Sequence, residues 1–223
     1  MIINSFLFGS PSNPLWNNLV AYYKGDNTPN DAKGVYNGTL TNGATYATGK
    51  INNGFSLDGV NDYVSISPTF GSIFSNNASA HTYSAWIYPT NVTDNYNWIF
   101  QNGSGTKGTS MVINLDRLGF FFDGGNALVT TTSVITVNAW NHVICVYNGA
   151  SQVKFYVNGN LVGTSTASWT DAGGATSTFI GSYAGAAYFF NGSIDEVGAW
   201  SRAITATEVT ELYNSGSGKQ YPL

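Results

Sequence analysis

The chain has 223 residues, of which 43% are hydrophobic and 15% aromatic, enough apolar material for the core of one β-rich domain. Only 9% of the residues are charged, the net charge is −4, and the eight Lys and Arg residues are scattered, which argues against a nucleic-acid partner. No stretch approaches the ~20 apolar residues of a membrane span.

Residues 1–18 are predicted to form an N-terminal arm, and residues 19–223 a single domain. The first eight residues of the arm are strongly apolar (MIINSFLF). Exposed apolar segments usually mark contact surfaces, so we expect residues 1–16 to pair with an edge strand or to dock onto a partner. The arm has no basic start followed by a long apolar run, so a standard cleaved export signal is not expected.

Short strands follow at close spacing. Residues 19–24 read as a strand, and the loop 25–34 is dense in turn formers and side-chain oxygens. Residues 83–88 are apolar on both faces, as is typical of a central strand, and 140–147 read the same way. Further short strands are predicted at 54–58, 62–66, 97–101, 110–115, 118–122 and 127–131. This rhythm predicts an all-β sandwich.

The end of the chain carries the plainest local signals. Strands 153–157 and 160–163 flank Asn158-Gly159, a pair that tolerates the positive φ angles of a tight hairpin turn. A helix is predicted over 206–214, because Thr205 and Glu208 form a capping-box pattern and an apolar stripe follows. Gly216 is expected to end it.

One carboxylate lies in a late strand, 191–200. Strict alternation of side chains places Asp195 on the same face as Ser193 and Val197. A bare buried carboxylate is costly, so Asp195 needs a cation, a charged partner or hydrogen-bond donors. A metal ion is the favoured partner.

Several motifs occur in a fixed order between residue 19 and the C-terminus. They are LVAYY at 19–23, NGTL at 37–40, GKINNGFSLDGVNDYV at 49–64, YSAWIYP at 83–89, WNH at 140–142, FYVNG at 155–159, FNGSIDEV at 190–197 and the closing segment 200–214. In this order they resemble the laminin G-like, concanavalin A-like lectin/glucanase superfamily, in the form often found in bacterial and phage proteins. The resemblance implies an all-β jelly-roll sandwich of two antiparallel sheets, here with one short C-terminal helix.

The resemblance also implies a structural calcium ion, held by the aspartate of the IDEV strand and by residues of the first loop. The first loop is rich in carboxylate and amide oxygens, the ligands that Ca²⁺ prefers. We expect Asp31, Asn37 and Asp195 as ligands, with Asp26 next. The alternative is that Asp26 and Asp31 cap turns while Asp195 accepts backbone hydrogen bonds.

No catalytic residue is predicted. The glucanases of this superfamily use a pair of glutamates on one strand, whereas this chain has only Glu196, Glu208 and Glu211, two of them in the predicted helix. With only His81 and His142, neither a zinc site nor a catalytic triad is supported. The single cysteine, Cys145, alternates with apolar residues and is expected to pack in the core.

Sugar binding needs aromatic faces near polar groups, and aromatic residues in or beside predicted loops are the candidates. These are Tyr96, Trp98, Trp169, Tyr183 and Tyr188. The alternative for each is packing in the core or at a sheet edge.

The sequence therefore predicts a non-catalytic recognition or adhesion module that binds a glycan or a cell surface and carries a structural calcium. The alternative is a structural or decoration protein of a virion, whose arm, residues 1–16, docks onto a capsid or tail protein. Either role places the domain outside the cell or on a virion surface. The oligomeric state stays open.

Overall fold

The computed structural model describes residues 13–74, 79–92, 96–103, 108–122, 126–130, 132–166 and 176–222. Its N-terminal half contains the 3-10 helix η1 (Pro14–Trp16) and strands β1 (Leu19–Tyr23), β2 (Asn37–Thr41), β3 (Thr45–Thr48), β4 (Asn53–Asp58), β5 (Tyr63–Ser67), β6 (His81–Pro89), β7 (Asn97–Asn102) and β8 (Thr109–Asn114). Strands β9 (Arg117–Phe122), β10 (Asn126–Val129), β11 (Asn141–Tyr147), β12 (Gln152–Val157), β13 (Asn160–Thr166), β14 (Thr178–Ile180) and β15 (Asn191–Trp200) follow, and then the helices α1 (Ala206–Tyr213) and η2 (Asn214–Gly216).

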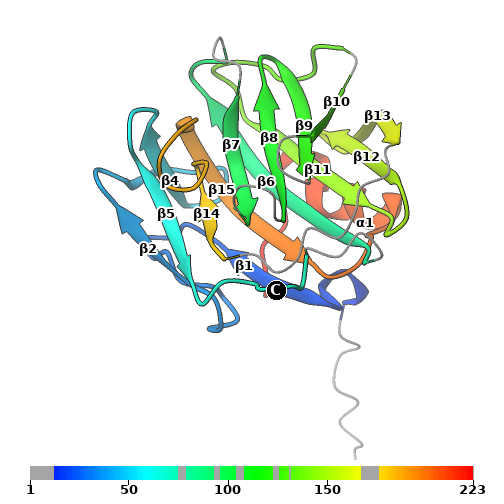
Figure 1. The fold of residues 1–223 in the computed structure, drawn as a ribbon, viewed down its shortest axis with the longest axis horizontal. Helices are drawn as coiled ribbons and strands as arrows, with labels where there is room; N and C mark the ends of the chain where they lie inside the picture. The colour runs from blue at the N-terminus through cyan, green and yellow to red at the C-terminus, as the bar shows by residue number, and fades with distance from the viewer. Residues whose placement is uncertain are drawn as a thin grey trace, which may run out of the picture.

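The strands form two antiparallel sheets that lie face to face (Figure 1). Sheet A has the order β13-β12-β11-β6-β15-β4-β3, with β1 paired to the second half of β15. Sheet B has the order β10-β9-β8-β7-β14-β5-β2. The predicted jelly-roll sandwich with one short C-terminal α-helix is therefore confirmed.

The main core fills the space between the sheets. It is built from alternate residues of each strand, for example Val143, Cys145 and Tyr147 of β11 and Phe120 and Phe122 of β9, all buried. Burial raises the pKa of the Cys145 thiol well above its usual value, as expected for a cysteine packed as a small hydrophobe.

The hairpin and the capping box near the C-terminus are also confirmed, but α1 ends at Tyr213 with left-handed Asn214 as its C-cap, so the prediction that Gly216 ends the helix was wrong. Asn158 and Gly159 take positive φ angles of 50° and 79° in the turn between β12 and β13. Thr205 caps α1, and its side chain accepts from the Glu208 N–H while Glu208 accepts from the Thr205 N–H. Within the described ranges, no helix is long and apolar enough to cross a membrane.

Strand β15 departs from the predicted alternation. Ile194 and Val197 both lie in the core between the sheets, and the register with β6 shifts between Asp195 and Gly198. Glu196 causes this shift, because it adopts a left-handed φ of +50° and forms a β-bulge. The prediction that Asp195 shares a face with Val197 was wrong, since alternation assumes an unbroken strand.

A second apolar cluster covers the outer face of sheet A, beneath α1 and η1. It contains Leu15, Tyr22, Trp200 and Leu212, among others. The ring of Trp16 stacks on Trp200 at 6.2 Å. Although residues 13–18 were assigned to the arm, part of this segment packs against the domain.

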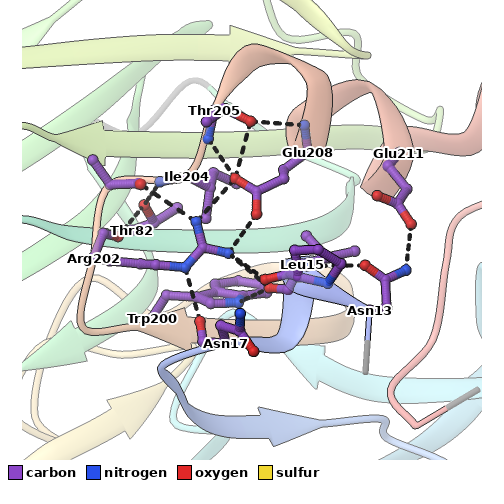
Figure 2. A network of polar contacts seen from close by, with 12 residues as sticks. Asn13, Leu15, Asn17, Thr82, Trp200, Arg202, Ile204, Thr205, Glu208 and Glu211 are labelled. Carbon is purple, nitrogen blue, oxygen red and sulfur yellow. Dashed lines mark hydrogen bonds and ion pairs between the residues drawn. The ribbon is translucent and has the colours of Figure 1, made fainter. Parts of the chain in front are cut away.

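Arg202 ties this segment to the C-terminal helix (Figure 2). Its guanidinium donates to the carbonyl oxygens of Pro14 (3.0 Å), Leu15 (3.0 Å) and Asn17 (2.8 Å). It also forms an ion pair with Glu208. One side chain thus satisfies several backbone carbonyls near the start of the described chain.

Candidate functional site

The predicted ligand-binding aromatic residues gather in one place. Tyr96, Trp98, Tyr183 and Tyr188 contact one another, and Phe121 of β9 joins them; we call these five residues the Trp98 cluster. Ring centroids lie 5.3 Å apart for Trp98 and Tyr188, 5.0 Å for Trp98 and Tyr183, and 4.9 Å for Tyr96 and Phe121. Trp169 lies outside the described residues.

Strand alternation and a tight loop build this cluster. Trp98 of β7 pairs with Val112 of β8, and neither belongs to the core between the sheets, so both face outward from sheet B. The loop 181–190 then folds back over the sheet. Tyr183 bridges to Ala187, and the Trp98 N–H donates to the Tyr188 carbonyl at 3.1 Å.

The members of the cluster differ in exposure. Trp98 is buried, with 3% of its surface exposed, whereas Tyr188 is 49% exposed. Tyr96, Phe121 and Tyr183 are partly exposed. Trp98 therefore supports the cluster from below, and the tyrosines form its accessible surface.

Two polar features accompany the rings. The indole N–H of Trp98 has no hydrogen-bond partner in the described part of the chain, although buried donors are nearly always paired with protein or water. Beside it, the Gln101 side chain accepts from the Ala184 N–H at 2.6 Å, which holds the loop to β7.

A neighbouring group of aromatic side chains was missed by sequence reasoning. Tyr63 of β5, Phe179 of β14 and Phe189 form the Tyr63 cluster, with ring centroids 5.5 Å apart for Tyr63 and Phe179 and 6.4 Å for Tyr63 and Phe189. All three are partly exposed. The sequence could have indicated Tyr63, because strand alternation places its side chain on the face of the sheet opposite to the core residues Val64 and Ile66.

The predicted metal ligands do not come together as one set. Both oxygens of Asp31 accept backbone N–H groups, from Tyr22 (2.9 Å), Lys33 (3.0 Å), Val35 (3.1 Å) and Tyr36 (3.2 Å). These donors occupy the positions that a cation would need, so Asp31 does not fit a calcium site in this arrangement.

Asn37 is likewise separate from Asp195. It lies exposed at the start of β2 in sheet B, where it pairs with Ser67, whereas Asp195 lies in sheet A. The hydrogen-bonded alternative therefore describes Asp31, and Asn37 has no geometry that links it to the other predicted ligands.

The structure instead gathers Asp26, Asp195 and Glu196, which we call the acidic group. They lie where β1 and β4 meet beside the bulge of β15. Gln220 bridges them, donating to Asp26 (2.9 Å) and to Glu196 (2.6 Å). One oxygen of Asp195 accepts from the N–H groups of Lys50 (2.8 Å) and Ile51 (3.0 Å), and the other accepts from the N–H of Glu196 (2.8 Å), so Asp195 also accepts backbone hydrogen bonds as the alternative expected.

Burial dominates the electrostatics of the acidic group. It raises the pKa of Asp195 to about 7, despite the N–H donors that oppose this shift. Burial, and then the charge of Asp195, raise the pKa of Glu196 to about 8. The Oε2 atom of Glu196 is buried with no partner among the described residues. Two adjacent carboxyl groups in this state favour either a proton or a cation.

In the described part of the chain, the acidic group included, no three His, Cys, Asp or Glu side chains are grouped closely enough to hold a metal ion by themselves. The rings of His142, Trp86 and Tyr213 stack on one another, and His142 Nε2 contacts the Ser84 hydroxyl at 3.0 Å. His81 is buried beside Thr109. Both histidines are buried.

Comparison with protein-family models gives one match, which spans residues 58–210 and is described as the concanavalin A-like lectin/glucanases superfamily. The chain belongs to this superfamily. The resemblance seen in the sequence motifs is therefore confirmed. A comparison of this superfamily member with curated proteins gives no match.

Solved structures share the fold of this superfamily member at low sequence identity. Domain 4 of AbnA, an extracellular GH43 arabinanase from Geobacillus stearothermophilus solved in complex with arabinotriose, is 23% identical with a TM-score of 0.71, over 91% of this chain and 98% of that one. The binding domain of Paraclostridial Mosquitocidal Protein 1 is 18% identical with a TM-score of 0.73, over 91% and 53%. The binding domain of botulinum neurotoxin DC, in complex with rat synaptotagmin II, is 15% identical with a TM-score of 0.72, over 90% and 52%. The chain thus spans about half of each toxin domain.

Proposed function

We propose that this chain is a non-catalytic recognition or adhesion module that binds a glycan through the Trp98 cluster. The observation that carries the proposal is the arrangement of aromatic rings on the outer face of sheet B, with Tyr188 half exposed above buried Trp98. Such a surface offers flat apolar faces to a sugar ring, and a rigid tryptophan holds them in place.

The comparisons support this proposal at the level of fold. Among the similar structures, one is a domain bound to arabinotriose and others are toxin binding domains. The arabinanase that contains the first domain is extracellular, which agrees with a place outside the cell for this chain. The ligand of this chain is a separate matter, because low-identity neighbours share the fold alone.

The carboxylates argue for a module without catalysis. A glucanase needs two carboxyl groups facing each other across the scissile bond. In the described structure, Glu208 is held by Arg202, Glu211 by Asn13 and Lys219, and Glu196 is buried. None of them belongs to the Trp98 cluster. Measurable turnover of a β-glucan that disappears in Glu196→Gln would overturn the proposal.

The direct test is binding of the purified protein to a glycan array and then to individual oligosaccharides by calorimetry. Tyr188→Ala should weaken binding about tenfold or more, the scale of one lost aromatic contact, while leaving thermal stability almost unchanged. Tyr46→Ala, at a half-buried tyrosine of β3 in sheet A, is the matched control and should keep wild-type affinity. Equal losses in the two variants, or no binding to any glycan, would refute the site.

A structural calcium ion remains part of the proposal, now with Asp26 and Asp195 as its carboxylate ligands. These are the two predicted ligands that lie in the acidic group, where Glu196 adds an unpaired oxygen. A divalent cation would relieve the repulsion between adjacent buried carboxylates and would complete its shell with amide, carbonyl and water oxygens.

A second candidate function is that of a displayed virion component, attached through the arm. The observation that favours this role is that residues 13–17 are hydrogen-bonded to the domain. A partner bound to the preceding residues would therefore be joined to the domain at a defined position. Deleting residues 1–12 leaves that attachment in place. Loss of assembly with a capsid or tail partner, together with unchanged glycan binding, would support this role, and unchanged assembly would exclude it.

A further inference from the structure

We infer that the ligand is an uncharged oligosaccharide long enough to contact both aromatic clusters on the outer face of sheet B. This inference rests on the proposed glycan-binding function and names the class of glycan. It depends on two observations, the absence of charged residues from five neighbouring strands and the loop that covers them, and the pairing of two aromatic clusters by that loop.

The first observation concerns charge. Five consecutive strands of sheet B contain no Asp, Glu, Lys or Arg. They run from the edge strand β2 through β5, β14 and β7 to β8. The covering loop 181–190 (GSYAGAAYFF) has none either. An acidic glycan would need Arg or Lys to pair with its carboxylate or sulfate groups, and a basic glycan would need Asp or Glu. The five strands and the loop supply neither, and among the described strands of sheet B the one charged residue is Arg117, which alternation places on the outer face at the start of β9.

The polar groups that the five strands supply are hydroxyls and amides. Thr39 and Ser65 lie opposite each other on β2 and β5, with Ser65 pointing the same way as Tyr63. Gln101 lies on β7 between the two clusters and opposite Phe179. Hydroxyl and amide groups are matched to neutral sugar hydroxyls, since each can both donate and accept.

The second observation concerns length. Trp98 and Tyr63 lie on β7 and β5, which are separated by β14, so the two strands are about 10 Å apart. Tyr188 and Phe189 are consecutive residues, and each belongs to a different cluster. Gly185 of the same loop approaches the Tyr63 ring so closely that a Cβ there would lie 3.0 Å from its hydroxyl oxygen.

A single sugar ring cannot stack on both clusters at this separation. The loop 181–190 nevertheless holds them in one rigid surface, because Gly181 and Phe190 are hydrogen-bonded to each other and Gly181 also donates to Ile99 of β7. The geometry therefore defines two stacking positions for one extended chain, with Tyr188 at the first and Tyr63 at the second.

The test is calorimetric titration of the full chain with three ladders of matched length. These are neutral arabino-oligosaccharides, acidic oligogalacturonates and basic chitosan oligosaccharides, each from one to six units. We expect binding to a neutral ladder only, with affinity that rises at least tenfold between the shortest bound member and the members that reach both clusters.

Single-residue variants test which residue forms each of the two stacking positions. Tyr188→Ala should weaken every length, whereas Tyr63→Ala should remove the gain from added length and leave the affinity for the shortest bound member unchanged. Phe189→Ala should repeat the Tyr63→Ala result, and Tyr63→Phe, which keeps the ring, should behave as wild type. Circular dichroism of each variant reports whether the fold is retained.

The outcomes separate this inference from the proposed function. Tighter binding of an acidic or basic ladder that still depends on Tyr188 would overturn the inference and leave glycan binding standing. Affinity independent of length, or unaffected by both Tyr63→Ala and Phe189→Ala, would overturn the second stacking position. Absence of binding to all three ladders and to the glycan array would refute the proposed function itself.

Discussion

Arg202 and Glu208 face each other with both guanidinium nitrogens engaged: Nη1 lies 2.9 Å from one carboxylate oxygen and Nη2 lies 2.5 Å from the other (Figure 2). The same Glu208 side chain also completes the capping box of α1. One ion pair therefore links the attachment of the N-terminal segment to the start of the C-terminal helix.

Arg202→Lys should lower the free energy of unfolding by about 1–2 kcal/mol, because lysine keeps the charge but loses the planar set of donors that reaches Glu208 and three carbonyl oxygens at once. Urea unfolding followed by tryptophan fluorescence measures the loss. The matched control is Arg117→Lys at an exposed position of β9, which should change stability by less than about 0.5 kcal/mol. Similar effects in both variants would show that Arg202 acts only as a surface charge.

Two glycines with nearly the same φ separate backbone strain from packing. Gly159 (φ +79°) and Gly34 (φ +75°) are both left-handed, but a Cβ at Gly159 would lie 2.8 Å from the Tyr213 ring, whereas nothing lies within 4 Å of one at Gly34. Gly34→Ala should cost about 1–2 kcal/mol through its backbone alone. Gly159→Ala should cost at least about 1 kcal/mol more, since Tyr213 must move. Equal destabilisation of the two variants in thermal unfolding would mean that packing of the Gly159 turn against Tyr213 of α1 does not contribute to stability.

Stability should fall in acid partly because of His142. Burial, followed by the charge of Lys50, lowers its pKa to about 3, so the folded protein excludes a proton that the unfolded chain takes up below a pKa of 6.5. Neutral His142 makes its full contribution to the free energy of unfolding above pH 6.5, and this contribution is lost as the pH falls toward 3. At pH 5 the loss is about 2 kcal/mol.

His142→Gln tests this linkage. The variant should be less stable than wild type at pH 7, but its further loss between pH 7 and pH 5 should be smaller by about 2 kcal/mol. His81, whose pKa burial lowers to about 4, contributes in the same direction and remains in both proteins. Parallel pH profiles for the two proteins would show that His142 is not the group that titrates.

Calcium binding is open to a direct measurement. Excess calcium should raise the midpoint of thermal unfolding by several degrees relative to a chelator, since a ligand at a hundredfold excess over its dissociation constant adds about 2.7 kcal/mol. Asp26→Asn should abolish the shift, and Asn37→Ala, at an exposed position of β2, should keep it. The calcium proposal fails if wild type does not respond, and loss of the shift in Asn37→Ala would restore the ligand set expected from sequence.

Several of the confirmed sequence predictions rest on short motifs whose residues interact locally. The capping box at Thr205 and the Asn158-Gly159 turn are each determined by residues within a few positions of one another. The sandwich itself followed from the order of several motifs along the chain. These features were accessible because neither local geometry nor motif order requires knowledge of which distant residues meet.

The errors came from contacts between distant segments. The bulge at Glu196 arises where β15 changes partners from β4 to β1, which no pattern within residues 191–200 reveals. The Asp31 carboxylate, in contrast, accepts N–H groups from residues near it in the chain, which is the turn-capping alternative left open in the sequence analysis. The Tyr63 cluster was missed because its members come from three separate segments.

Both ends of the described chain leave the sandwich on the same side. Asn13 bonds to Glu211, and the Trp16 ring meets Tyr221 at 5.3 Å, all over the outer face of sheet A. The aromatic clusters lie on the outer face of sheet B. Any tether, scaffold or neighbouring domain joined at either end would therefore hold the molecule from behind, and would leave the aromatic face of sheet B turned away from the point of attachment.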